Sequence, residues 1–318
     1  MSEAAPSVAA IVLSYNGRDD VLSCVGWLSA SDYPRLRVVV VDNASTDDTV
    51  AEVAARFPAC TVLRNAQNLG FAGGCNVGIR HALEAGDDLV MLVNPDTTAG
   101  PDLVTRLVAF MDSHPRAGVV GPKTHSTQPM PDGSPKLLYK GAWRRTLPLR
   151  QSIPGIESGD AGGDDEPRRT DYVWGHAMML RAAALRRTGP LDSAFFMYYE
   201  DLDLCRRMEA AGYEVWCDPQ AVIRHDAPDG ARGLRSERWR WECKVHSTRV
   251  FHRKHHGRLA SLLLTPLTIL GEAQELARTR RGAAARELLS AYARSFGAGN
   301  RRPTGPATVL PPAATPGR

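Results

Sequence analysis

Side chains that could bind a ligand follow three apolar runs in the first hundred residues. Tyr15 comes after VAAIVLS, Asp42 after LRVVVV, and Asp96 after LVMLVNP. These types suit an aromatic stack, a hydrogen-bond acceptor and a cation ligand. Asp and Asn are also ordinary turn and helix-capping residues, so a purely structural role stays open for each position taken alone. Three such positions in succession favour a common ligand site.

A second group of acids, Glu200, Asp201 and Asp203, follows the aromatic stretch FFMYY. Carboxylates at a helix start are favoured by the helix dipole, so capping explains at least one of them. An acid beside aromatic side chains is partly desolvated, which raises its pKa and makes it a better general base near neutral pH. The stretch therefore predicts a catalytic base.

His225 ends the short apolar run AVIRH. A histidine at the end of a strand is either a core residue or a metal ligand. With Asp96 as a partner, the metal ligand is the favoured interpretation.

The segment Asn68–Gly78, NLGFAGGCNVG, is rich in glycine where a helix begins. Glycines let the backbone approach a ligand closely, and the free N–H groups of a helix start can bind a phosphate. A plain loop is the alternative, because neither GKS/T nor GxGxxG spacing is present.

The elements that must position these residues alternate between strand and helix from Val8 to about Pro122, which predicts a parallel α/β sheet. The run Val38–Val41 indicates a strand buried on both faces. Ligands of such sheets collect beyond the carboxyl ends of the strands. Lys123–Thr170 predicts a long, mobile loop, and Tyr172–Arg181 a further strand. Short strands are expected to end at Asp218 and at His225.

The C-terminal part, Leu259–Phe296, has a helical pattern of apolar residues among arginines. Such a helix suits an anionic membrane surface, and docking on its own core is the equal alternative. The tail from Asn300 to Arg318 is rich in Pro, Ala and Thr and is expected to be disordered.

A chain of 318 residues suits one large or two small domains. The formal net charge of +4 does not indicate a nucleic-acid binder. The basic excess is local: Arg224–Arg258 has ten Lys and Arg residues against four Asp and Glu residues, which invites an anionic partner.

Six cysteines without CxxC spacing predict buried free thiols in a reducing compartment. The N-terminus is acidic where a signal peptide would be basic, and no stretch is long enough to cross a bilayer. We therefore expect a cytoplasmic protein, with peripheral contact on the inner face of the plasma membrane as an option.

The chain resembles the inverting glycosyltransferases of family 2, which have the GT-A fold, and among them the bacterial rhamnosyltransferase-like branch. The matching stretches are SYNG, VVDNASTDDT, NLGFAGGCNVG, NPDT, WGHAMMLR, FFMYYEDLDLCRR and VIRH, in the family's order. The resemblance implies a Rossmann-like α/β domain with a mostly parallel central sheet over residues 1–256. A helical extension would occupy 257–299 and a tail 300–318.

By this resemblance, Tyr15 would lie against the nucleobase of the donor and Asp42 would accept its ring N–H. Asn94-Pro95-Asp96 stands where the family has DxD, so Asp96, with His225, would hold Mg²⁺ or Mn²⁺. Asn94 leaves fewer negative charges on the cation. The full set expected to bind the donor is Tyr15, Asn16, Asp42, Asn43, Asn68, Gly70, Phe71, Asn76, Asn94 and Asp96.

Asp201 resembles the general base that deprotonates the acceptor, and Glu200 is the second choice for that role. Inversion needs a single in-line attack, so one base must face the acceptor while a cation neutralises the leaving diphosphate. The resemblance favours dTDP-L-rhamnose as the donor, with UDP-sugars next.

A polyprenyl-diphosphate-linked saccharide is the expected acceptor, and contact with anionic lipid is expected through 224–296. A soluble natural-product acceptor is the alternative. Two other functions were weighed: a nucleotidyltransferase, for which the glycine-rich basic loop is missing, and a non-catalytic carbohydrate- or nucleic-acid-binding protein. The oligomeric state is left open.

Overall fold

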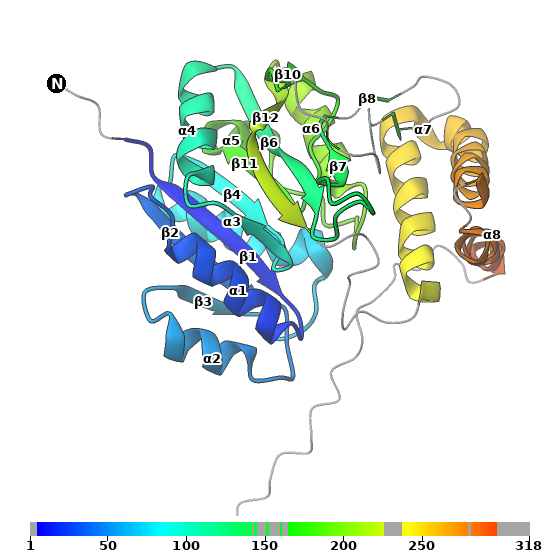
Figure 1. The fold of residues 1–318 in the computed structure, drawn as a ribbon. Coiled ribbons are helices and arrows are strands. Elements are labelled where there is room, and N and C mark those ends of the chain that lie inside the picture. Colours follow the sequence, from blue (N-terminus) through cyan, green and yellow to red (C-terminus); the bar gives the residue numbers. More distant parts are fainter. Residues whose placement is uncertain are drawn as a thin grey trace, which may run out of the picture.

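A ten-stranded β-sheet forms the centre of the molecule, with helices on both faces and two further helices beside it (Figure 1). This computed structural model describes residues 5–141, 143–144, 151–152, 160, 165–225, 237–278 and 281–297. The predicted C-terminal tail, 300–318, lies outside the described residues.

The first half of the sheet is parallel, as the alternating pattern predicts. Its strands lie in the order β4-β1-β2-β3. Helices connect them along the chain. The elements are β1 (Val8–Ser14), α1 (Arg18–Ser29), β2 (Leu36–Asp42), α2 (Thr49–Arg56), β3 (Thr61–Arg64), α3 (Gly70–Ala85) and β4 (Leu89–Val93).

The second half of the sheet has mixed directions. Strand β11 (Ala177–Arg181) lies antiparallel between β4 and β6 (Ala117–Ser126), and β12 (Glu214–His225) runs parallel to β6. The remaining elements are β5 (Thr97–Ala99), α4 (Leu103–Ser113), β7 (Leu137–Tyr139), β8 (Trp143–Arg144), β9 (Gln151–Ser152), β10 (Arg168–Arg169), α5 (Ala182–Thr188) and α6 (Glu200–Ala210).

Three boundaries differ from the prediction. The two strands expected to end at Asp218 and His225 are one strand, β12, whose register with β6 shifts between Asp218 and Val222. The strand expected over Tyr172–Arg181 begins only at Ala177. The segment Lys123–Thr170 was predicted as a loop, but β6 continues into it and β7 and β10 lie within it. Residues 142, 145–150, 153–159 and 161–164 of that segment lie outside the described residues.

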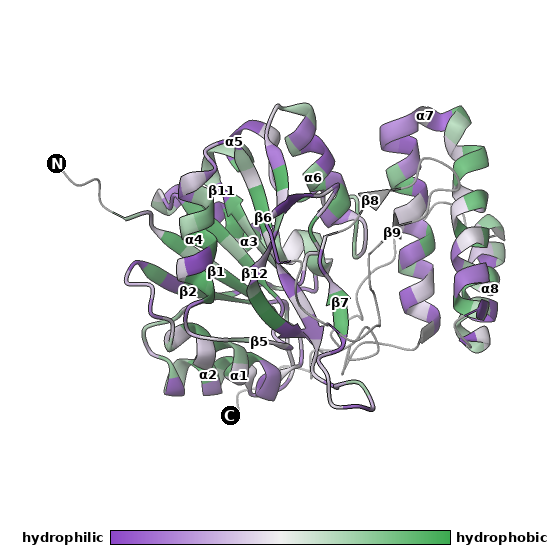
Figure 2. Cartoon of the chain, turned by 45° about the horizontal axis from the view of Figure 1, so that its top comes forward, coloured by the Kyte–Doolittle hydropathy of each residue, from purple (hydrophilic) through white to green (hydrophobic). Residues whose placement is uncertain are grey.

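The sheet separates two hydrophobic cores, because side chains alternate between its faces. Val39 and Val41 belong to the core beneath α3, α5 and α6, whereas Val38 and Val40 belong to the core beneath α1 and α4. The run Val38–Val41 is thus buried on both sides, as predicted. Figure 2 shows the hydrophobic residues concentrated along these central strands.

Beyond the sheet, α7 (Glu237–Arg278) and α8 (Gly282–Gly297) lie side by side (Figure 1). Helix α7 is two helices joined at Gly257, whose φ of 84° and ψ of 169° are not helical. The first part packs against the sheet domain, where Ser247 donates a hydrogen bond to the carbonyl of Met197 at 2.8 Å. Among the described residues, no helix is long and apolar enough to cross a membrane.

Candidate active site beyond the carboxyl ends of the strands

The ends of β1 and β2 lie side by side, since Ser14 pairs with Asp42 in the parallel register. Asp42 is fully buried, and its carboxylate accepts the Ser45 N–H at 3.2 Å. The guanidinium of Arg64 lies 3.8 Å away, on a side chain that is 66% exposed. Tyr15, one residue beyond β1, is half-buried and stays open to a ligand.

Four non-glycine residues have a positive φ in the described part of the chain; two follow β1 and β2, and two directly precede α6. They are Asn16, Ala44, Tyr198 and Tyr199, with φ between 52° and 72°. A hydrogen bond stabilises the positive φ of Asn16, because the side-chain Oδ1 of Asn16 accepts the Thr46 N–H at 2.7 Å. Such strain is retained at sites where the surroundings over-determine the backbone.

Asn43 is the centre of the polar network that positions the glycine-rich segment. It is 2% exposed, and its amide nitrogen donates to Asn68 Oδ1 at 3.0 Å and to the Gly70 carbonyl at 3.1 Å. Its oxygen accepts the Leu69 N–H at 3.0 Å. The side chains of Asn43 and Asn68 therefore shape the loop before α3.

Gly70 and Phe71 connect this loop with the aromatic stretch before α6. The Phe71 N–H donates to the Phe196 carbonyl at 2.7 Å. A Cβ at Gly70 would lie 2.5 Å from that same oxygen, and Gly70 has φ of +77°, so only glycine fits. Two segments that are 125 residues apart in the chain are brought together by this close approach.

Asn76 was predicted to bind the donor, but the structure uses it elsewhere. Its nitrogen donates to the Leu191 carbonyl at 2.7 Å, and its oxygen accepts the Leu191 N–H at 3.0 Å. Both ends of the amide are thus occupied, and the side chain is 4% exposed. Asn76 lies well inside α3, where it holds the 191–193 segment, so the geometry does not support a donor contact.

Asp96 and His225 face each other, as expected of two ligands of one cation. The His225 Nε2 lies 3.1 Å from Asp96 Oδ1, which is buried and makes no hydrogen bond. Strand pairing brings the two residues together. Strand β12 pairs with β5 and places His225 opposite Thr97, the residue after Asp96. The amide nitrogen of Asn94 lies 3.5 Å from the same ring nitrogen.

This donor set suits a divalent cation. A carboxylate oxygen without a hydrogen bond, beside an imidazole nitrogen, can bind Mg²⁺ or Mn²⁺. The described residues contain no group of three or more His, Cys, Asp or Glu side chains that could hold a metal. Two protein ligands leave most of the coordination sphere to other oxygens, such as those of a phosphate ligand.

Asp201 is held by two backbone donors at the start of α6. The Gly175 N–H donates to its Oδ2 at 3.0 Å, and the Leu202 N–H to its Oδ1 at 2.7 Å. Burial raises the pKa of Asp201, and these hydrogen bonds partly offset that rise. Its neighbour Glu200 is 5% exposed, and burial, followed by the charge of Asp201, raises the Glu200 pKa well above its usual value.

The segment Trp174–Gly175–His176 links Asp201 to the pair formed by Asp96 and His225. Gly175 binds Asp201, while the ring of His176 stacks on His225 with centroids 4.5 Å apart. The His176 carbonyl also accepts the Asn94 N–H at 2.8 Å. Neither residue was predicted as part of the site. The signal available was a histidine inside an otherwise apolar stretch that was expected to be a strand.

The surroundings of His176 favour the neutral form of its imidazole. Burial, and then the neighbouring His225, lower its pKa well below the usual range. Its Nε2 lies 2.8 Å from Thr124 Oγ1. The ring of His176 therefore supports His225 by stacking, and its lowered pKa favours the form that adds no positive charge there.

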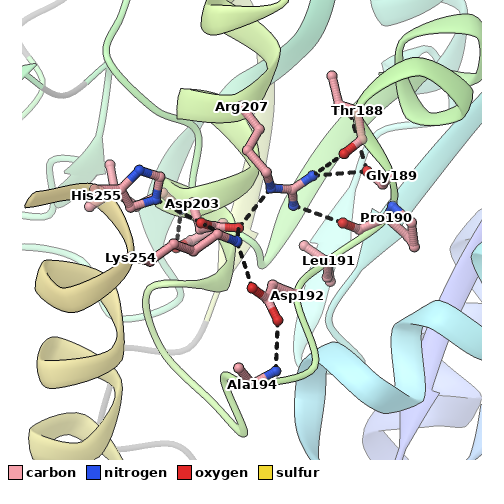
Figure 3. A network of polar contacts seen from close by, with 12 residues as sticks. Thr188, Gly189, Pro190, Leu191, Asp192, Ala194, Asp203, Arg207, Lys254 and His255 are labelled. Atoms are coloured by element: carbon pink, nitrogen blue, oxygen red, sulfur yellow. Dashed lines mark hydrogen bonds and ion pairs between the residues drawn. The ribbon is translucent and has the colours of Figure 1, made fainter. Parts of the chain in front are cut away.

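A second network anchors α6 to α7 and to the segment before Ala194 (Figure 3). Asp203 is fully buried and contacts Lys254, His255 and Arg207 within 3.0 Å. Hydrogen bonds from these three side chains lower the pKa of Asp203 to about 2, against the effect of burial. Arg207 also donates to the carbonyls of Thr188, Gly189 and Pro190. Asp203, the third acid of the stretch, is thus a structural residue.

Comparisons with known proteins identify the family of the chain. The family model described as Glycosyl transferase family 2 matches residues 9–187, which is more than half of the chain. The N-acetylglucosaminyl-diphospho-decaprenol L-rhamnosyltransferase of Mycobacterium tuberculosis is 28% identical over 250 residues, covering 73% of this chain and 79% of that protein. The rhamnosyltransferase WbbL of Escherichia coli is 23% identical over 79% of this chain and 97% of its own length.

A similar fold occurs among solved structures. The mannosyltransferase PcManGT of Pyrobaculum calidifontis, solved in complex with GDP-Man and Mn²⁺, superimposes with a TM-score of 0.55. The match covers 92% of this chain and 76% of that one at 20% identity, which concerns the fold alone. From the family match over more than half of its length, this chain belongs to glycosyl transferase family 2.

Proposed function

We propose that this glycosyltransferase moves L-rhamnose from a dTDP-linked donor to a hydroxyl of a polyprenyl-linked saccharide, with inversion at the transferred carbon. The observation that carries the proposal is the Trp174–His176 segment, which places the hydrogen-bonded Asp201 and the Asp96–His225 pair at one site. A base and two cation ligands at one site suit single displacement.

Asp201 is proposed as the base. Its two backbone hydrogen bonds fix the carboxylate, and its raised pKa makes it a better proton acceptor near neutral pH. It would take the proton of the acceptor hydroxyl as that oxygen attacks the sugar. Glu200 favours its protonated form in its buried position, so it suits holding the acceptor rather than accepting the proton.

Asp96 and His225 are proposed to bind Mg²⁺ or Mn²⁺ together with the donor's diphosphate. A divalent cation there would neutralise the charge of the departing diphosphate. Asn94 holds this end of the site through its backbone contact with His176. Tyr15 is proposed to stack on the nucleobase and Asp42 to accept its ring N–H.

The donor and acceptor are proposed from the relatives. Two of them are named as rhamnosyltransferases, and the name of one specifies a decaprenol diphosphate acceptor. A UDP-sugar donor is the second candidate, because the ring N–H that Asp42 would bind is common to thymine and uracil. The domain division proposed from sequence, 1–256 and 257–299, would assign transfer to the first part.

The nucleotide assignment is tested by thermal unfolding of the purified protein with dTDP, UDP, GDP, CDP or ATP, each with Mn²⁺ or with EDTA. We expect dTDP or UDP to raise the melting temperature by a few degrees only with Mn²⁺, because ligand at about 100 times its Kd adds about 2.7 kcal/mol. No response to any nucleotide in folded protein would favour a non-catalytic binding protein.

The two proposed cation ligands are tested in the same experiment. Asp96→Ala and His225→Ala should each abolish the Mn²⁺-dependent rise. Asp112→Ala, which removes an exposed carboxylate on α4, is the matched control and should respond like the wild type. An unchanged rise in Asp96→Ala would remove Asp96 from the cation site.

A further inference from the structure

Exposed leucines gather on one short stretch of the second part of α7. Eight large hydrophobic side chains are exposed among the described residues, and five of them lie between 259 and 270. These five are between 48% and 82% exposed: Leu259, Leu262, Leu263, Leu267 and Leu270. Single exposed leucines are ordinary, but a contiguous row usually marks an interaction surface.

The leucine row forms one face of a helix. At about 100° per residue, the five positions fall within an arc of about 140°. The stretch from 259 to 271, LASLLLTPLTILG, contains no charged residue. The arc is therefore an uninterrupted apolar stripe along the outside of the helix.

The opposite face of the same helix is unusually polar for a buried surface. Ser261, Thr265 and Thr268 are each less than 10% exposed. Thr268 Oγ1 lies 2.9 Å from His252 Nε2, on the first part of α7, and donates to the Leu264 carbonyl at 2.8 Å. Ile269 and Ala273, with the partly buried Leu276, add apolar contact to the small core shared with Val245 and α8.

The helix thus has its hydroxyl groups inside and its leucines outside. A helix selected only to dock on its own protein has the reverse pattern, because burial of leucine is favourable and burial of hydroxyl groups is not. The inverted pattern indicates that an apolar partner covers the leucine row.

Positive charge lies at both ends of the row. Arg258 and Arg278 are exposed, and neither guanidinium has a hydrogen-bond or ion-pair partner within the part of the chain that the structure describes. Two acids lie between the row and Arg278: Glu272 is paired with Lys244, and Glu275 is exposed. Unpaired arginines that flank an apolar stripe are complementary to a surface with an oily interior and anionic groups at its border.

We propose that the leucine row inserts into the interface of a bilayer that contains anionic lipid, so that α7 lies on the membrane without crossing it. A helix in the interfacial plane needs an apolar face and basic residues at its border, and the second part of α7 has both. The Asp203 network joins the first part of α7 to α6, so the bilayer contact is connected to the helix that begins at Glu200 and Asp201. The inference deepens the proposed lipid-linked acceptor and rests on it for the choice of partner.

Flotation of the full-length protein with lipid vesicles tests the proposal without donor or acceptor. We expect binding to vesicles of phosphatidylcholine with phosphatidylglycerol, and weaker binding to phosphatidylcholine alone. The double variant Leu262→Ser/Leu263→Ser should bind at least about tenfold more weakly, since each buried leucine contributes about that factor or more. Arg258→Glu/Arg278→Glu should lose the preference for anionic lipid.

Matched controls separate the surface from general effects. Leu289→Ser changes an exposed leucine of α8 outside the row, and Arg80→Glu changes an exposed arginine of α3; both should float like the wild type. Circular dichroism should show the same melting temperature for every variant. The substituted side chains are exposed, so the fold should tolerate their replacement.

Two results would overturn the proposal. One is wild-type protein that stays unbound with anionic vesicles, or a leucine variant that floats equally well. The other is a dimer in light scattering that the same leucine substitutions dissociate, which would mean that a second copy covers the row. Transfer to a short, soluble acceptor in protein that does not float would leave the proposed function standing and remove only the lipid contact.

Discussion

Asp201 and Glu200 are adjacent acids with different surroundings. Asp201 accepts two backbone hydrogen bonds, whereas Glu200 Oε2 is buried without a partner in the described structure. Hydrogen bonds to the charged form favour a carboxylate, and burial without them favours the neutral acid. Asp201 is therefore suited to accept a proton, whereas Glu200 favours its neutral form. A difference of this kind between two neighbouring carboxyls is commonly used to assign the roles of acid and base.

The first prediction concerns the proton acceptor. Asp201→Asn should lower kcat/KM by about 10² to 10⁴, the usual contribution of a positioned base. In the wild type, the rate should fall as pH drops through the raised pKa of Asp201, because a protonated carboxyl cannot accept a proton. The Glu200→Gln variant should show the same fall in rate at low pH.

The measurement is the pH dependence of kcat/KM for the three proteins. Glu200→Gln serves as the control because it changes the neighbouring acid on the same turn of α6. A pH profile that is lost in Glu200→Gln and kept in Asp201→Asn would exchange the two roles.

The positions of site residues were predictable where they follow the end of a strand. Asp42 and Asp96 follow apolar runs, and the strands β2 and β4 put them where parallel sheets bind ligands. His176 was not predictable in this way, because it lies in a stretch that reads as a strand but crosses the site as a loop before Ala177. Stacking on His225 comes from strand pairing across the sheet, which local sequence does not record.

At the scale of elements, α6 is held from outside by α7. Asp203 meets Arg207 one turn along its own helix and Lys254 and His255 on α7. These contacts fix the helix that begins at Glu200. Local sequence does not separate Asp203 from Asp201, because two of its three partners, Lys254 and His255, reach it only through the packing of α7 on α6.

The second prediction concerns this network. Because the pKa of Asp203 is about 2 in the folded protein against 3.8 ordinarily, its charge stabilises the fold above pH of about 4. That stability, about 2 kcal/mol, should be lost as pH falls toward about 2. Asp203→Asn should lower the free energy of unfolding near neutral pH by about 3 kcal/mol, because it leaves buried cations unpaired.

Urea unfolding at several pH values measures both effects. Asp192→Asn removes a more exposed carboxylate that also contacts Lys254, and it should cost less than about 1 kcal/mol. Equal losses for the two variants would show that Asp203 is no more than a surface charge.

Longer elements were predicted better than their ends. The period of apolar residues identified α1, α2 and α4, but the helices bury their apolar residues to different extents. In α4 the apolar stripe is buried, whereas in α2 Val53 is the only apolar residue that is buried. Strand β12 was predicted as two pieces because Asp218 and Pro219 read as a break, whereas the structure accommodates them by a register shift. A bulge of this kind is decided by the neighbouring strand β6 and is not visible in the local pattern.

At the scale of the whole molecule, the burial of the cysteine thiols shows how tightly the chain is packed. All six cysteines are free, and all but Cys60 are buried. Burial raises the pKa of every thiol, to about 12 for Cys217 and Cys243. A protonated, buried thiol reacts slowly, because the thiolate is the nucleophile.

The third prediction follows from this distribution. In native protein, Cys60 alone should react with a thiol reagent on the time scale of minutes, and all six should react after unfolding in guanidinium. Cys60→Ser should remove the fast phase. Rapid reaction of two or more thiols in that variant would contradict the packing around the sheet.

The central claim is single displacement by the acceptor hydroxyl, with Asp201 as the base and a cation held at Asp96 and His225. Its most direct test is transfer from dTDP-L-rhamnose to a short-chain polyprenyl-diphosphate saccharide, with the anomeric configuration of the product determined by NMR. The account predicts an inverted product that forms with Mn²⁺, fails to form with EDTA, and is nearly absent with Asp201→Asn. A product with retained configuration, or undiminished transfer by Asp201→Asn, would contradict it.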